Sequence, residues 1–301
     1  GAPLEIEDVD ISKPGPREVL VRTAATGVCR SDLHYIEGSY SHDMPVVLGH
    51  ESAGVVEAVG SDVRYVEPGD HVITCLSVFC GHCEACLTGH MAICGNQAAV
   101  RRGADEPPRL SQGGEPVHQF LDLSSFAEQI LAHEHALVKI RKDMPLDRAA
   151  LIGCAVTTGV GAVHNTAKVE VGSTVVVIGC GGVGLAAVNI AAALGANVIA
   201  VSRTKAKLDM AKALGAVHTL TAGEKTAEEI VELTQGGAHV SVDALGTTAT
   251  WMPSILSLRS RGRLLRLGVS SQDEKGQLPL PADLLVVREL NIIGSFGMQA
   301  R

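Results

Sequence analysis

The sequence predicts an α/β protein, with a doubly wound parallel six-stranded sheet in the second part of the chain and irregular all-β structure in the first. Three observations predict this fold. From Thr174 onward, short aliphatic segments alternate with helical ones, as in a parallel sheet covered by helices on both faces. Before that, short β-like runs are separated by Gly and Pro, which punctuate strands. The composition is 46% hydrophobic but only 3% aromatic, which fits buried strands rich in Val, Ile and Leu.

The first part, residues 1–155, is predicted to be the β domain. Leu4–Ile11 alternates apolar and charged residues, as a half-exposed strand does. A turn is expected at Lys13–Pro16, because Pro and Gly alternate there. Further strands are expected at Glu18–Arg22, Val46–Leu48, Gly54–Val59 and His71–Thr74. This half is therefore predicted to consist of short strands joined by long loops.

The second part, residues 156–301, is predicted to hold the parallel sheet. Its strands are expected at Thr174–Ile178, Asn197–Val201, Val217–Leu220, His239–Asp243, Arg263–Leu267 and Leu290–Ile293. Helices are expected from Gly184, from Lys205, from Thr226 and near Thr248–Leu258, the first two ending at glycines. The stretch from Val171 to Ser202 carries no charge and is long enough to span a membrane. Because six glycines interrupt it, we interpret it as buried in a soluble protein.

Charge and composition exclude several classes of protein. The net charge of −8 argues against a nucleic-acid binder, which would carry a basic face. The hydrophobic content excludes intrinsic disorder. The first residues, GAPLEIEDVD, are acidic and lack an apolar run, so they do not resemble a signal peptide. We therefore expect a cytoplasmic protein with no membrane and no nucleic-acid partner.

A glycine turn follows the first strand of the predicted sheet. Gly179, Gly181 and Gly184 form a G-x-G-x-x-G pattern that also contains Gly182 and Val183. Between a strand and a helix, this pattern is the fingerprint of a Rossmann dinucleotide-binding fold. Its first glycine permits the tight turn, the second lets the backbone approach the pyrophosphate, and the third allows close packing of helix on strand. The alternative is a structural glycine turn without a ligand.

The end of the second strand selects the ribose of the cofactor. An acidic residue there would bind the 2′-hydroxyl of NAD, but this chain has Ser202 and Arg203, with Lys205 and Lys207 nearby. Ser and Arg can bind and neutralise a 2′-phosphate. We therefore expect NADP(H) to be preferred over NAD(H). The alternative is that Arg203 is merely solvated and that Ser202 accepts either cofactor.

Four cysteines lie close together in the sequence. Their spacing is C-x2-C-x2-C-x7-C, and they are Cys80, Cys83, Cys86 and Cys94. Four thiolates at such spacing suit one closed, tetrahedral structural zinc. Disulfides are the competing interpretation, but a reducing compartment favours the metal.

Three further residues stand in motifs of their own. Cys29, His50 and Cys154 are far apart in sequence, and each alone would more often be an ordinary buried residue. Their surroundings, including G-H-E-x2-G-x5-G-x2-V from Gly49, resemble those of the zinc-dependent medium-chain alcohol dehydrogenases. The four-cysteine lobe and the glycine turn extend this resemblance over nearly the whole chain. The segments before Cys154 resemble the long-form branch of that family.

This resemblance implies a GroES-like β domain and a second zinc, which would be catalytic and held by Cys29, His50 and Cys154. Three protein ligands would leave the fourth position open to water or substrate. The remaining roles that it implies concern proton transfer, the orientation of a ligand and cofactor binding. Glu51 would approach the metal during ligand exchange, and Asp32 would orient His50 (or merely cap a helix). Ser31 would bond the substrate oxygen, and His34 would pass the proton to solvent. Arg30 would contact the pyrophosphate of the cofactor, and Thr158 would contact its nicotinamide end.

The predicted function is the interconversion of alcohols and aldehydes or ketones by hydride transfer with NADP(H). One alternative is an NAD-dependent polyol or amino-alcohol dehydrogenase of the same fold, and another is a catalytically silent cofactor-binding protein. By the same resemblance we expect a homodimer or homotetramer. We also expect that a first strand and a C-terminal segment returning to the β domain are missing from these 301 residues.

Some residues remain outside these sites. Cys75 and Cys180 are predicted to be small packing residues. The run His133–His135 could bind a metal, but we expect a solvated turn.

Overall fold

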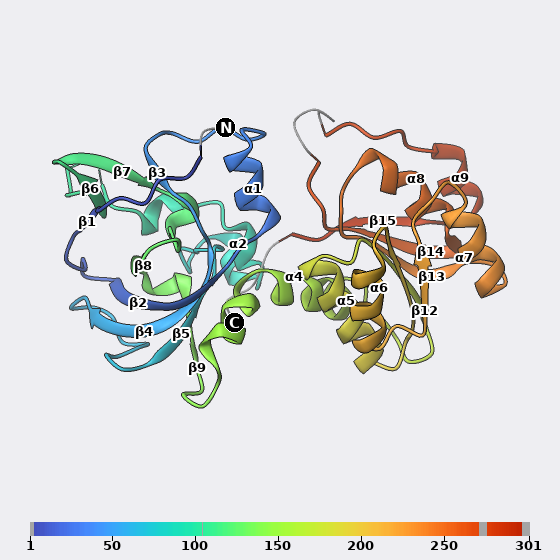
Figure 1. Cartoon of the computed structure of the whole chain (residues 1–301), viewed down its shortest axis with the longest axis horizontal. Helices are drawn as coiled ribbons and strands as arrows, with labels where there is room; N and C mark the ends of the chain where they lie inside the picture. The colour runs from blue at the N-terminus through green and yellow to red at the C-terminus, as the bar shows by residue number, and fades with distance from the viewer. Residues whose placement is uncertain (1–2, 104, 271–275, 297–301) are drawn as a thin grey trace. The chain divides into compact units, whose positions relative to one another are not determined.

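The computed structural model describes residues 3–103, 105–270 and 276–296, and the chain divides into two compact units. One unit contains the residues up to Thr157, and the other comprises Thr158–Phe296. Each unit has its own sheet or sheets (Figure 1) and its own buried apolar clusters.

The first unit is built on two β-sheets. A five-stranded antiparallel sheet has the order β8-β2-β4-β5-β9, and a four-stranded sheet has the order β1-β6-β7-β3. The strands are β1 (Asp10–Ile11), β2 (Glu18–Gly27), β3 (Val46–Val47), β4 (Glu51–Val59), β5 (His71–Thr74), β6 (Leu110–Gln112), β7 (Glu115–Gln119), β8 (Gln129–His133) and β9 (Leu137–Ile140). The helices are α1 (Arg30–Ile36), α2 (Glu84–Leu87) and α3 (Leu146–Ala149), with 3₁₀ turns at Met91–Ile93, Gln97–Val100, Phe120–Asp122, Glu134–Ala136 and Ala150–Gly153. Helix α4 (Ala155–Gly161) crosses the boundary between the units.

The structure corrects two predicted strands of this unit. Leu4–Ile11 is a strand only at Asp10–Ile11, which pairs with β6. Leu4 and Ile6 are exposed, so the apolar side of the alternating pattern has no core to cover. Strand β2 continues to Gly27, five residues beyond the predicted end, because β4 pairs with it along that length. Strands β6 to β9 were not predicted, since their runs are only three to five residues long.

The second unit confirms the predicted six-stranded parallel sheet, with the order β12-β11-β10-β13-β14-β15. This is the strand order of a doubly wound dinucleotide-binding fold. The strands are β10 (Thr174–Ile178), β11 (Asn197–Ser202), β12 (His218–Thr221), β13 (Ala238–Asp243), β14 (Leu258–Arg266) and β15 (Asn291–Gly294). The helices are α5 (Gly182–Ala193), α6 (Lys205–Ala213), α7 (Thr226–Thr234), α8 (Thr248–Leu256) and α9 (Ala282–Val287), with a π-helical turn at Ala162–Thr166.

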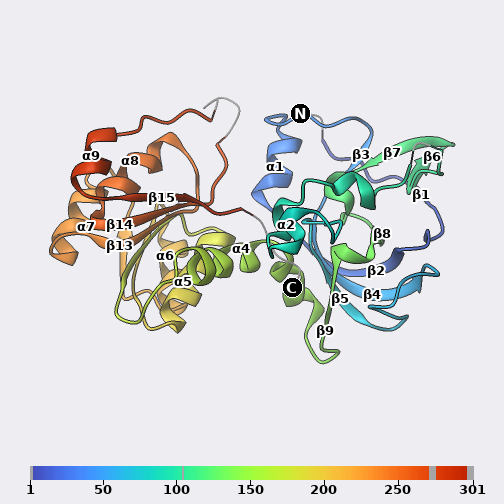
Figure 2. The same ribbon diagram turned by 180° about the vertical axis from the view of Figure 1, so that it is seen from behind.

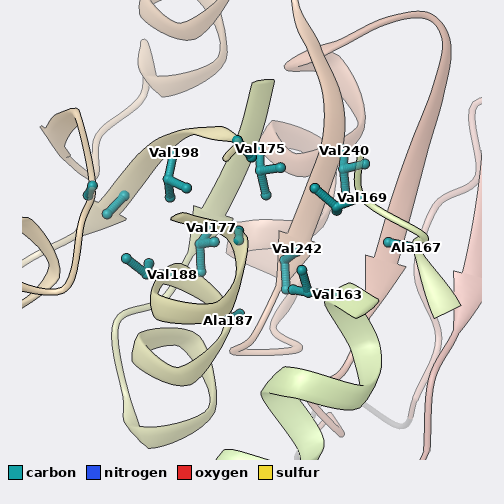
Figure 3. Close-up of a cluster of buried hydrophobic side chains, with 14 of the residues drawn as sticks. Val163, Ala167, Val169, Val175, Val177, Ala187, Val188, Val198, Val240 and Val242 are labelled. Atoms are coloured by element: carbon teal, nitrogen blue, oxygen red, sulfur yellow. The ribbon is translucent and has the colours of Figure 1, made fainter. Parts of the chain in front are cut away.

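Apolar side chains on both faces of this sheet are buried. Val175 and Val177 of β10 lie in the cluster that α5 covers, which is shown in Figure 3. Val176 and Ile178 point the other way, into a cluster with Ile230 of α7. In Figures 1 and 2, α5 and α6 lie side by side, on the opposite side of the strands from α8. Burial on both faces explains why these strands are continuous aliphatic runs rather than alternating ones.

The uncharged stretch from Val171 to Ser202 contains β10, α5 and β11. In the described part of the chain, no single helix has the length and apolarity that a membrane crossing needs. One pair of helices, Leu146–Gly153 and Ala155–Thr166, satisfies that test of length and composition only when taken together, and it is bent by 52°.

The predicted solvated turn at His133–His135 is wrong, because His133 and Glu134 are buried. His133 accepts a hydrogen bond from the backbone N–H of His135, and Glu134 pairs with Arg17 at 2.8 Å. The ring of His135 stacks on Phe79 at 4.3 Å. Burial lowers the pKa of His133 to about 3, so this histidine is neutral and serves as an acceptor.

A buried ion network joins β2 to the segment after the cysteine lobe. The Glu18 carboxylate accepts hydrogen bonds from Arg102 at 2.5 Å and from Arg109 at 2.7 Å, and also one from the N–H of Gly15. Burial alone would raise the pKa of Glu18, but these bonds lower it below its usual value. The network therefore ties together segments about 90 residues apart in sequence through one carboxylate.

We expect the substitution Glu18→Gln to lower the free energy of unfolding by about 3 kcal/mol at pH 7, because it leaves Arg102 and Arg109 buried without their anion. The folded-state pKa of Glu18 is depressed. The contribution of Glu18 to the free energy of unfolding is thus complete above its unfolded pKa of about 4.3 and is lost as the pH falls through its folded pKa. Urea unfolding of both proteins at pH 7 and at decreasing pH measures this contribution.

The control is Glu57→Gln, which removes the exposed pair of Glu57 with Arg22. Its cost should stay below about 1 kcal/mol. Equal costs for the two variants at pH 7 would contradict the assignment.

Candidate functional site

The structure brings four potential metal ligands of the first unit together. Cys29, His50, Glu51 and Cys154 each offer one ligand atom, and these atoms all lie within 4.8 Å of one another. Cys29 is the N-cap of α1, directly after β2. His50 and Glu51 stand at the start of β4, and Cys154 follows the 3₁₀ turn Ala150–Gly153. Residues from three distant segments of the chain therefore converge at one point.

The geometry of this cluster suits a zinc ion. The sulfur atoms of Cys29 and Cys154 are 4.0 Å apart, and two sulfurs on a tetrahedral zinc would lie about 3.8 Å apart. His50 Nε2 is buried and has no hydrogen-bond partner among the described residues. A buried ring nitrogen left without a partner in this way costs free energy unless a ligand satisfies it. Two sulfurs, one imidazole and a nearby carboxylate form a donor set that zinc prefers.

Asp32 holds the imidazole of His50 in place. Its Oδ1 lies 3.0 Å from His50 Nδ1, and both side chains are fully buried. Its Oδ2 accepts the backbone N–H of Cys29 at 2.9 Å. Asp32 thus combines the two roles considered from the sequence, since it orients His50 and also caps α1. A carboxylate on Nδ1 leaves Nε2 as the nitrogen that faces the sulfurs.

The electrostatics of the cluster favour a cation. The Cys154 thiol, through its hydrogen bond, lowers the pKa of Cys29 to about 4, whereas the Cys29 sulfur in turn raises the pKa of Cys154. Burial and the charge on Cys29 raise the pKa of Glu51 to about 7. Burial alone would lower the pKa of His50, but Asp32 and Cys29 raise it to about 9. Only one sulfur can ionise easily by itself, and a divalent cation is the partner that would let both do so.

Helix α1 carries the other residues predicted for this site. Ser31 is exposed, and His34 lies three positions later on the same face of the helix. The Nδ1 atom of His34 is buried without a hydrogen-bond partner among the described residues, and its ring meets Tyr40 edge-on at 5.4 Å. Arg30 is exposed and lies 3.4 Å from Glu37, so this structure gives its guanidinium a carboxylate partner.

The four clustered cysteines form a second potential metal site. The sulfur atoms of Cys80, Cys83, Cys86 and Cys94 lie within 4.8 Å of one another, and those of Cys83 and Cys86 are 3.4 Å apart. A disulfide would need about 2.05 Å, and all four thiols are free. Backbone N–H groups of Cys80, Cys83 and Asn96 point at sulfurs of the cluster, which favours thiolates. The arrangement fits a closed four-sulfur zinc site rather than disulfides.

The glycine turn of the second unit is shaped for close approach. Gly179 has φ +100°, and a Cβ on Gly184 would lie 1.8 Å from the Gly179 carbonyl oxygen. Gly181 is the N-cap of α5 and offers no side-chain cap, and a Cβ there would meet nothing within 4 Å. The first N–H groups of α5 are therefore uncapped beside open space, as a pyrophosphate site requires. The helix begins at Gly182, two residues before the predicted start.

The residues predicted to select the ribose stand at the carboxyl end of β11. Ser202 is buried, whereas Arg203 and Lys207 are exposed. Lys207 acts electrostatically on Cys180, because its charge opposes the burial that raises the pKa of that thiol to about 11. Lys205 instead pairs with Asp209 at 2.8 Å. Arg203 after β11 and Lys207 in α6 form no ion pair within the described part of the chain.

Several residues remain to be placed. Thr158, predicted to contact the nicotinamide, lies half-buried in α4. Cys75 and Cys180 are buried, and Cys180 donates to the carbonyl of Val201. Leu245, which sequence reasoning missed, lies against the glycine turn, since a Cβ on Gly179 would come within 2.5 Å of its Cγ. Only strand pairing between β10 and β13 brings it there, and no sequence motif signals that contact.

Comparison with known proteins gives two family matches. Residues 15–142 match the alcohol dehydrogenase GroES-like domain, and residues 182–301 match the zinc-binding dehydrogenase domain. The solved structure of an alcohol dehydrogenase zinc-binding domain protein from Burkholderia ambifaria is similar to this chain, with 37% sequence identity and a TM-score of 0.91. The match covers 100% of this chain and 82% of that chain.

Two other solved structures are also similar. The benzyl alcohol dehydrogenase from Acinetobacter calcoaceticus is 31% identical, with a TM-score of 0.89, over 98% of this chain and 81% of that chain. An NAD-dependent alcohol dehydrogenase is 32% identical, with a TM-score of 0.80, over 98% and 81%.

We expect the purified protein to contain about two zinc ions per chain, one for each cluster. Cys154→Ser and Cys83→Ser should each lose about one of them. Only Cys83→Ser should strongly lower the melting temperature, because the regular structure between Cys80 and Cys94 is limited to the short α2 and the 3₁₀ turn Met91–Ile93. Elemental analysis and thermal unfolding measure both effects.

The matched control is Cys180→Ser, which changes a buried cysteine of the other unit and should keep both ions. A wild-type protein with one zinc, or a single substitution that removes both, would contradict the two-site assignment.

Proposed function

Because the chain belongs to the zinc-dependent medium-chain alcohol dehydrogenase family, we propose that it interconverts alcohols with aldehydes or ketones by hydride transfer to or from NADP(H). The observation that carries the proposal is the buried cluster of Cys29, His50 and Cys154 with an open His50 Nε2. A catalytically silent cofactor-binding protein would have no need of such a cluster.

Zinc held by Cys29, His50 and Cys154 would supply a Lewis acid for the oxygen of the alcohol or carbonyl. The chain's own residues prepare the site for this role. Asp32 fixes the orientation of His50 from behind, so that the imidazole need not reorganise when the metal binds. Glu51 is buried beside the ligands, with a pKa of about 7. We assign it the role of a carboxylate that approaches the metal when ligands exchange.

Proton transfer falls to α1 in this proposal. The Ser31 hydroxyl would bond the substrate oxygen and, during alcohol oxidation, accept its proton while releasing its own hydroxyl proton toward His34. His34, on the same face of the helix, would pass that proton to solvent. The unpartnered Nδ1 of His34 supports this role, since a ring nitrogen without a fixed partner is free to exchange a proton.

The second unit would bind the cofactor. The uncapped N-terminus of α5, with Gly179, Gly181, Gly182, Val183 and Gly184, would bind the pyrophosphate through backbone N–H groups. When bound, the nicotinamide supplies or accepts the hydride. Arg30 and Thr158 remain assigned to the pyrophosphate and the nicotinamide end on the family pattern.

The preference for NADP(H) rests on Ser202, Arg203 and Lys207. They offer a hydroxyl and two exposed cations, from Ser202 and Arg203 at the end of β11 and from Lys207 in the first turn of α6. This set would attract a 2′-phosphate. A similar structure is described as NAD-dependent, so the alternative of an NAD-dependent polyol or amino-alcohol dehydrogenase is decided by the cofactor experiment below.

Location and assembly complete the proposal. The eight cysteines, none of which forms a disulfide in the described structure, fit a reducing compartment such as the cytoplasm. Strand β15 is an edge of the six-stranded sheet, and the exposed side chains of Val286 and Val287 on the preceding α9 support a homodimer or homotetramer built on that side.

The activity is tested with a panel of benzylic, aliphatic, polyol and amino alcohols, with NADP⁺ and NAD⁺ offered separately and nicotinamide absorbance as the readout. Cys154→Ala should abolish turnover while the circular dichroism spectrum stays unchanged, because it removes a ligand but little of the core. Turnover retained by Cys154→Ala would refute the catalytic metal site.

We expect Arg203→Ala to raise the KM for NADP⁺ by about tenfold or more, because a charged hydrogen bond to phosphate is lost. The KM for NAD⁺ should stay within about twofold, because NAD⁺ has no 2′-phosphate for Arg203 to bind. Lys205→Ala is the matched control, since Lys205 already pairs with Asp209. A wild-type enzyme that prefers NAD⁺, or equal effects on both cofactors, would overturn the assignment.

A further inference from the structure

An arginine and an aspartate form a buried ion pair at the carboxyl edge of the parallel sheet. Asp243 ends β13, Arg266 ends β14, and the two residues are register partners. Arg266 donates to Asp243 Oδ2 at 2.9 Å, and the side chains are 17% and 0% exposed. In doubly wound folds the ligand binds outside this edge of the sheet.

The pair fixes the loop of residues 244–247 from both sides. Asp243 Oδ1 accepts the backbone N–H groups of Leu245 and Gly246, at 3.2 and 2.9 Å, and the Thr250 hydroxyl at 2.9 Å. The other guanidinium nitrogen of Arg266 donates to the Gly246 carbonyl at 2.5 Å. Both polar groups of the Gly246 backbone are therefore bound by this one ion pair.

The loop so fixed rests directly on the glycine turn. A Cβ on Gly179 would come within 2.5 Å of Leu245 Cγ, and a Cβ on Gly184 would meet Ala244 at 3.4 Å. On its other side the 244–247 loop touches the segment that follows β14, since a Cβ on Gly246 would lie 2.2 Å from the backbone of Gly268. A shift of this loop would therefore be transmitted to the turn, because interiors at this packing density leave no slack.

Stability alone gives no clear reason for a charged pair here. Replacing a buried ion pair by apolar residues is often neutral or stabilising. What the ion pair adds is a fixed orientation, because the planar guanidinium of Arg266 binds a carboxylate and a carbonyl at the same time. Arg266 also donates to Ser270 at 2.8 Å and lies 5.4 Å above the ring of Trp251. Its position is therefore fixed by four separate groups.

We propose that Arg266 is a positioning residue for the cofactor: with Asp243 it holds the 244–247 loop against Gly179 and so sets the shape of the pyrophosphate turn. This assignment rests on the proposed function, because it requires that the turn bind a dinucleotide. Arg266 acts through the loop and carries no chemical step.

The test measures NADPH and NADH binding by isothermal titration calorimetry, with steady-state kinetics alongside. Arg266→Leu should raise the Kd of the cofactor and its KM together by about tenfold, because a buried carboxylate and carbonyl lose their donor. At saturating cofactor, kcat should stay within about twofold. Arg266→Lys keeps the charge but not the two-pronged hydrogen bonding of the guanidinium, so its Kd and KM should rise less. This variant serves as the test if Arg266→Leu does not fold.

Arg263→Leu is the matched control: it lies three residues earlier on β14, and among the described residues its side chain forms no hydrogen bond or ion pair. It should leave the Kd unchanged. The emission of Trp251, the chain's single tryptophan, should shift in both Arg266 variants and stay constant in Arg263→Leu.

The two proposals fail in different ways. If the wild type binds NADPH or NADH and the Arg266 variants keep its Kd, the positioning role is refuted and the proposed function stands. A fall in kcat at unchanged Kd would also refute it. If the wild type binds neither cofactor, the proposed function fails, and this assignment fails with it.

Discussion

The hydrogen bond between Asp32 and His50 is the contact on which the metal cluster depends. It joins two fully buried side chains at 3.0 Å, and the same carboxylate caps α1 through Cys29. One aspartate therefore sets the ring that faces the sulfurs and the helix that carries Ser31 and His34. Without it, the imidazole could rotate and the helix would lose its N-terminal anchor.

The two units solve a similar physical problem in different ways. Each presents polar groups that have no internal partner. In the first unit, bulky side chains such as Phe120 close around His50 and leave Nε2 without a partner. In the second unit, glycines leave the N–H groups of α5 uncapped, and any Cβ at Gly184 would collide with Gly179.

Local patterns made much of this predictable from the sequence. The glycine turn and the four-cysteine lobe depend on close spacing, so Gly179–Gly184 and Cys80–Cys94 could be interpreted without a structure. The family resemblance supplied the dispersed set of Cys29, His50 and Cys154. The features that could not be predicted depend on contacts between segments far apart in the sequence. Leu4–Ile11 has the alternation of a strand but no core beneath it. The pair of Asp243 and Arg266 exists only because β13 and β14 align in register, and no motif encodes that register.

The two cysteine-containing clusters differ in the order in which a chain can assemble them. The lobe closes over a separation of 14 residues, whereas Cys29 and Cys154 are 125 residues apart. Closing the longer loop costs more chain entropy and requires β2 and β4 of the five-stranded sheet to be in place. The lobe would thus be able to bind an ion while the nascent chain is still short. The dispersed cluster comes together only when its distant segments have folded, so that an ion bound there would report a folded unit.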